Sequence, residues 1–176
     1  VVCHGCYDAS CQLKMSSIEG IERGATEAEV YHSTRLSAAP TTRLFEDAHS
    51  VSEWREKGFY AVLNERADTA EANREAGFMY RMLALKEKHP LPDGKLLPAS
   101  FDLSLSREQS CAKDETFSQF SREHPLWGMP FALPGLPEKE QKVLKKWLEQ
   151  GALYKTRPPL LSEYAVQIKR WENVLN

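Results

Sequence analysis

Residues 1–11 are Val1-Val2-Cys3-His4-Gly5-Cys6-Tyr7-Asp8-Ala9-Ser10-Cys11, and they hold three of the four cysteines and one of the five histidines. Covalent attachment of haem requires two cysteines separated by two residues and followed at once by a histidine that binds the iron. The order Val1-Val2-Cys3-His4 supplies the last four positions of that five-residue motif. We therefore expect a cysteine directly before Val1 in a longer natural chain. Cys3 would then bind haem c covalently, and His4 would be the proximal iron ligand.

Two other interpretations of this cysteine cluster stay open. Cys3, Cys6 and Cys11 with His4 are ligand types that zinc prefers, although the adjacent Cys3 and His4 rarely reach one tetrahedral ion. A disulfide between Cys6 and Cys11 would close a short loop in an oxidising compartment, and it is compatible with haem at Cys3. We expect Cys6 and Cys11 to be oxidised or close together, and Cys111 to be free. An absorption spectrum distinguishes a haem protein from a zinc or disulfide module.

The composition is ordinary for a soluble globular protein. A chain of 176 residues with 41% hydrophobic residues can form one domain with its own core. The net charge of −2 argues against a nucleic-acid partner, because phosphate binding needs a concentrated positive face. No apolar run approaches the roughly 20 residues that cross a bilayer, so we expect this part of the protein to be soluble or to rest on a membrane surface.

A second candidate ligand of the iron is Met129, in the segment Trp127-Gly128-Met129-Pro130. Gly128 admits close approach of another backbone, and Pro130 stiffens the loop. A thioether held opposite an imidazole completes a six-coordinate haem and raises its reduction potential, so we expect Met129 to be the distal ligand. The alternative is a methionine that fills the core, and this is the role that we assign to Met79 and Met82.

Apolar periodicity predicts a mainly α protein with long loops and helices at 52–58, 69–88, 138–150 and 162–174. Ser52 and Ser162 are the expected N-caps. In the second helix, Met79, Met82, Leu83 and Lys86 follow at steps of three and four residues on one side. We expect turns over 12–36, with a short helical stretch near residues 26–31 and a buried Leu13. The segment 59–64 is predicted to be extended, and 95–128 to be irregular.

Two sets of motifs carry a resemblance to known families. The first set is Cys3-His4, Met129-Pro130, Leu136-Pro137 and Lys145-Lys146-Trp147-Leu148-Glu149-Gln150-Gly151-Ala152. It resembles a class I cytochrome c domain. The second set is Cys3-His4-Gly5-Cys6-Tyr7-Asp8-Ala9-Ser10-Cys11-Gln12-Leu13-Lys14, Glu19-Gly20-Ile21-Glu22-Arg23-Gly24-Ala25, Thr42-Arg43-Leu44-Phe45-Glu46-Asp47-Ala48, Val62-Leu63-Asn64-Glu65 and Arg170-Trp171-Glu172-Asn173-Val174-Leu175-Asn176. It resembles the bacterial fatty acid cis/trans isomerase.

The resemblance implies a haem c enzyme of the Gram-negative periplasm that is associated with the membrane surface. Its substrates would be unsaturated fatty acids or phospholipid acyl chains, converted from cis to trans without a shift of the double bond. Residues 1–152 would form the class I cytochrome c-like haem domain. Residues 153–176 would be a linker and a helix that lead into the rest of a longer protein.

The expected mechanism is that oxidised iron withdraws electron density from the alkene, so that the carbon–carbon axis can rotate before the electron returns. With both His4 and Met129 on the iron, either the electron moves outer-sphere or Met129 leaves to admit substrate. The alternative function is an electron-transfer cytochrome c domain of a larger periplasmic protein, with the same site residues Cys3, His4 and Met129. An apolar tunnel to the haem would favour the isomerase, and a charged rim would favour the carrier.

Overall fold

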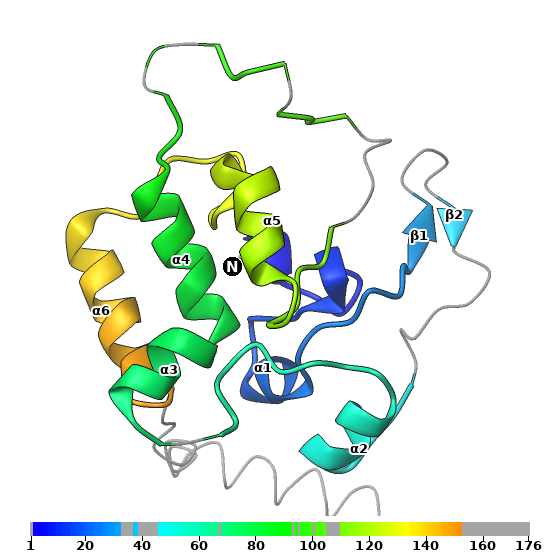
Figure 1. The fold of residues 1–176 in the computed structure, drawn as a ribbon. Coiled ribbons are helices and arrows are strands. Elements are labelled where there is room, and N and C mark those ends of the chain that lie inside the picture. Colours follow the sequence, from blue (N-terminus) through cyan, green and yellow to red (C-terminus); the bar gives the residue numbers. More distant parts are fainter. Residues whose placement is uncertain are drawn as a thin grey trace, which may run out of the picture.

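The computed structural model describes residues 2–32, 37–38, 46–66, 68–92, 94, 96–99, 101–104 and 110–152. Within these ranges the chain is mainly helical, as the sequence predicted (Figure 1). The α-helices and 3-10 helices (η) are, in order, η1 (Val2–His4), η2 (Ser10–Gln12), α1 (Ile18–Arg23), α2 (Val51–Glu56), α3 (Ala70–Ala76), α4 (Phe78–Lys88), α5 (Phe117–Glu123), η3 (Pro125–Trp127) and α6 (Glu138–Glu149). Two-residue strands β1 (Tyr31–His32) and β2 (Ser37–Ala38) pair antiparallel between α1 and α2.

Two of the predicted helices are confirmed, 52–58 as α2 and 138–150 as α6. The predicted N-cap of α2 was two residues late. Ser50 has the extended backbone that an N-cap needs, and its hydroxyl accepts a hydrogen bond from the N–H of Glu53 at 3.3 Å. After α2, Gly58 takes a positive φ of 84°, which ends the helix as expected.

The predicted helix 69–88 is two helices, because Gly77 leaves the helical conformation with φ −74° and ψ 103°. Its N–H still donates to the Asn73 carbonyl at 3.2 Å, which closes α3. The next helix starts in a new direction, and the N–H of Met79 donates to the Val62 carbonyl at 3.0 Å instead of continuing α3. The apolar periodicity runs through this break, so the pattern alone predicted one continuous helix.

Two short helices fall in segments predicted to be turns or irregular, α1 in 12–36 and α5 in 95–128. Six or seven residues are too few for a clear helical period, and such helices depend on packing for their stability. The helical stretch expected near 26–31 was wrong. At the start of this stretch, the N–H of Thr26 donates to the Cys11 carbonyl, and Ala25 forms an isolated β-bridge with Tyr60. The backbone is therefore paired with other segments instead of forming a helix.

The core consists of two clusters that share α4. The first contains Leu13, Ile21, Ala25, Val62, Met79, Leu83, Leu148 and Ala152. The second contains Met82, Leu85, Ala112 and Phe120. Met79 and Met82 are therefore core residues, and Leu13 is buried, as predicted. In Figure 1, α4 and α6 lie side by side with α3 at one end, so α4 is the central helix of the fold.

The predicted pairing of the cysteines was wrong. Cys11 bonds to Cys111, 100 residues away in sequence, with their α-carbons 5.7 Å apart. Cys6 is a free, exposed thiol, and its Sγ donates to the Asp8 carboxylate instead of reaching Cys11. Cys11 has a positive φ of 55° and packs against the first core cluster, so its side chain is directed into the fold. The long-range bridge joins the N-terminal segment to the chain just before α5.

The predicted helix 162–174, with its N-cap Ser162, lies outside the described residues, as does the linker 153–176. The division at residue 152 stays a prediction. In the described part of the chain, none of the helices combines the length and apolar character that crossing a bilayer requires.

Candidate functional site

His4, the expected proximal ligand, ends η1 and is half-buried. Its Nδ1 lies 3.1 Å from the carbonyl oxygen of Leu13. A carbonyl can only accept, so Nδ1 carries the proton and Nε2 of the neutral ring keeps its lone pair. Histidines that bind metals usually donate their other N–H in this way, because the bond fixes the orientation of the ring. Burial lowers the pKa of His4, while the bond to Leu13 acts in the opposite direction.

The carbonyl that holds His4 is itself well fixed. Leu13 is buried in the first core cluster, and the N–H of Met15 donates to the His4 carbonyl at 2.8 Å. His4 is thus hydrogen-bonded to both Leu13 and Met15. These bonds fix the orientation of the imidazole ring relative to the core.

Cys3, the expected haem-binding cysteine, precedes His4 in η1 and is free and exposed. Its thiol is therefore available for a covalent bond. Cys6 is also free and exposed, and its hydrogen bond to Asp8 raises the pKa of its thiol, which makes it a poorer nucleophile. The zinc alternative loses one ligand, because the sulfur of Cys11 is bonded to Cys111. Among the described residues, no group of three or more His, Cys, Asp and Glu side chains is placed to hold a metal ion.

Arg23 supports the loop after His4, and sequence reasoning missed it. It is only 3% exposed, and its guanidinium donates to the Gln12 amide oxygen at 2.8 Å. The guanidinium carbon lies 4.5 Å from the ring centre of Tyr7 and 4.4 Å from that of Phe59, so aromatic faces contact the cation. Gln12 in turn donates to the Ala28 carbonyl at 3.2 Å. A single sequence carries no local signal for these contacts, because they join separate segments.

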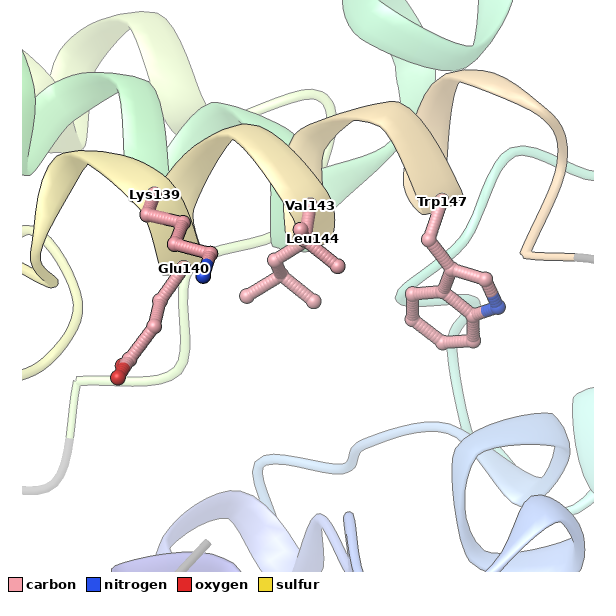
Figure 2. Close-up of a pocket in the computed structure, with 5 residues that line it drawn as sticks. All are labelled: Lys139, Glu140, Val143, Leu144 and Trp147. Carbon is pink, nitrogen blue, oxygen red and sulfur yellow. The ribbon is translucent and has the colours of Figure 1, made fainter.

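An apolar cleft of about 560 Å³ runs along one side of α6. Val143, Leu144 and Trp147 form its apolar wall, with Lys139 and Glu140 at one end. Figure 2 shows these five side chains on the side of the helix that faces the N-terminal part of the chain, drawn in blue. Val143 is 67% exposed, so this apolar side chain is open to a ligand in the cleft. A cleft of this size falls within the roughly 300–1,000 Å³ typical of sites for ligands.

Met129, the expected distal ligand, lies in the loop between η3 and α6 and is half-buried. Its N–H donates to the Met82 carbonyl at 3.0 Å, and its side chain packs against the second core cluster. The close approach expected at Gly128 is confirmed, since a Cβ there would lie 2.2 Å from the backbone nitrogen of Lys86. Met129 is therefore fixed on α4, whereas His4 is fixed by Leu13. Leu13, which holds His4, and Leu83 of α4, the helix that holds Met129, both belong to the first core cluster.

Lys86 is a second residue that sequence reasoning did not single out as functional. Its place on the apolar side of the helix was predicted, and the side chain is indeed buried, with 2% exposed. It lines a cavity of about 100 Å³ together with Met129. Burial lowers the pKa of Lys86.

Comparison with known protein families identifies the chain's relatives. The family model described as fatty acid cis/trans isomerase (CTI) matches residues 39–176. The matched range covers most of the chain and includes Met129, but it begins after Cys3 and His4. No curated protein and no solved structure matches the chain.

Proposed function

We propose that this chain, which belongs to the fatty acid cis/trans isomerase family and is therefore an enzyme, acts on its substrates through a haem c held by Cys3, His4 and Met129. Cis/trans isomerisation of fatty acids follows from the family. The covalent haem is the added step, and one observation carries it. The Nδ1 of His4 is hydrogen-bonded to the Leu13 carbonyl at 3.1 Å. Cys3, the residue directly before His4, has a free thiol.

The residues present fit such a group. His4 offers Nε2 with a fixed ring direction, Cys3 offers an accessible thiol, and Met129 offers a thioether on a loop anchored to α4. The apolar wall of α6 suits a flat hydrophobic cofactor or an acyl chain. These features support a class I cytochrome c-like domain over residues 1–152.

In the mechanism, the bound haem would supply an oxidising iron that withdraws electron density from the double bond and returns it, with no net oxidation. Leu13 keeps the imidazole of His4 in one orientation through its carbonyl. The Met82 carbonyl holds the backbone of Met129, and the unbranched thioether side chain packs beside the second core cluster. Met129 would hold the haem iron through its thioether. If that sulfur had to make room for substrate, a turn of the side chain would leave the backbone bond to Met82 in place, and the outer-sphere alternative would need no such turn.

The proposed substrates are unsaturated fatty acids or phospholipid acyl chains, met at a membrane surface in the Gram-negative periplasm. The Cys11–Cys111 bridge supports this compartment, because disulfides persist where the environment is oxidising. The apolar wall of the cleft on α6 supports an acyl substrate, and the charged Lys139 and Glu140 are confined to one end.

The test uses the full-length protein. We expect a haem absorption spectrum in the wild type, and His4→Ala should lose haem and isomerisation together. His49→Ala is the matched control, since His49 is exposed. The trans-to-cis ratio of acyl chains in vesicles is followed by gas chromatography.

Met129→Leu distinguishes an isomerase from an electron carrier, with Met82→Leu as the control for a change in the core. A carrier retains haem with a lower reduction potential and never alters the acyl ratio. An isomerase in which Met129 must leave keeps or gains turnover. An intact haem spectrum with an unchanged acyl ratio in the wild type would establish the carrier instead.

A further inference from the structure

Lys86 is the buried charged group that the proposed mechanism does not use. It lies near the C-terminal end of α4, and 2% of the residue is exposed. Among the described residues, its Nζ has no hydrogen-bond partner. An ammonium that is removed from water without a partner is costly, so proteins rarely keep one unless something else completes its environment.

The cavity beside Lys86 indicates what that partner is. It measures about 100 Å³, and its apolar walls include Leu83, Pro90, Met129 and Leu136. A space of this size holds a small polar head group but not a whole acyl chain, since a single water needs only about 10–15 Å³ of such volume. Apolar walls around one cation favour a ligand with a single charge and a hydrocarbon body.

The other polar residues of the cavity leave that cation unmatched. The Glu87 carboxylate also lines the cavity, but it accepts from Lys145 Nζ at 2.5 Å. Gln141, on α6, also lines the cavity and can donate its amide hydrogens. The cavity therefore lies beside one unpaired ammonium, which is buried behind its wall and would meet an incoming anion by a turn of the Lys86 side chain. The amide of Gln141 is a second donor for that anion.

We propose that Lys86 binds a carboxylate in this cavity, next to Met129. A carboxylate matches the single ammonium and the apolar walls, whereas a phosphate would require more donors. Two sources of this chemistry are available if the proposed function holds, namely the head group of a free fatty acid and a propionate of the haem. In either case Lys86 would place a carboxylate at a fixed position relative to Met129.

The first measurement is binding of oleate and of methyl oleate to the full-length protein, below the critical micelle concentration, by equilibrium dialysis. Lys86→Met removes the charge and keeps an apolar side chain of similar length. Lys88→Met makes the same change at an exposed position two residues further along α4. If the fatty acid is the source, Lys86→Met weakens oleate binding roughly ten- to hundredfold, as expected for a charge-assisted hydrogen bond, and leaves methyl oleate unchanged.

The second measurement is the reduction potential of the haem-loaded protein as a function of pH. If a haem propionate is the source, Lys86→Met lowers the potential and alters its pH dependence, because the propionate near the iron loses its counter-charge. Oleate binding then stays at the wild-type level. Lys88→Met should leave the potential unchanged.

The proposal is overturned if Lys86→Met and Lys88→Met have the same oleate affinity and the same reduction potential at every pH. Circular dichroism shows whether each Lys86 variant is folded. If Lys86→Met misfolds, both measurements are made with Lys86→Gln. Absence of haem from the wild type would refute the proposed haem function, and oleate binding would still decide whether Lys86 holds the fatty acid carboxylate.

Discussion

The disulfide between Cys11 and Cys111 allows the sharpest test of the fold. It closes a loop of 100 residues. The loss of chain entropy in the unfolded state predicts a stabilisation of about 4.7 kcal/mol for a loop of that length. The double variant Cys11→Ala/Cys111→Ala removes the bridge without leaving an unpaired thiol. With a urea dependence of about 2 kcal/mol per molar, its unfolding midpoint should fall by about 2 M.

Urea unfolding followed by far-ultraviolet circular dichroism measures this change in oxidised protein. Cys6→Ala is the matched control, because Cys6 is exposed and free, and its effect should stay within about 0.5 kcal/mol. Alkylation of the unreduced protein followed by mass spectrometry should label Cys6 and spare Cys111. The reasoning fails if Cys111 is labelled, or if Cys6→Ala destabilises the protein as much as the double variant does.

Three further predictions concern single contacts. Gly128→Ala should lower the free energy of unfolding by at least about 1–3 kcal/mol, because the new Cβ would lie 2.2 Å from the backbone nitrogen of Lys86. Thermal unfolding measures this loss, and an unchanged midpoint would contradict the close packing. Asn73→Ala should cost about 1–3 kcal/mol in urea unfolding, since it leaves the Glu149 carbonyl and the Asn64 amide without their 2.8 Å partners, and Asn73→Asp should restore only the bond from Asn64. Lys86→Met should raise the free energy of unfolding by about 1–3 kcal/mol when no carboxylate ligand is added, and a loss of stability would show that the ammonium is already satisfied.

Local sequence determined the chemistry of the N-terminal segment and much of the helix content. Cys3 and His4 are adjacent, so their pairing as a candidate haem motif needs no knowledge of the fold. The loop at Met129 was recognisable because glycine and proline restrict the backbone on either side of it. Helices α2 and α6 were predicted because their ends and their apolar faces are encoded within a few consecutive residues.

The tertiary structure alone decided which distant residues meet. Cys11 has Cys6 as its near neighbour in sequence, yet packing directs it to Cys111. The His4 ring gains its fixed direction from Leu13, and the break at Gly77 lets α4 start anew against Val62. Lys86 follows the apolar pattern of its helix, but only the closed core shows that its ammonium has no described partner. Local patterns reflect the energetics of neighbouring residues, whereas partners across the fold are selected by the burial of whole elements against one another.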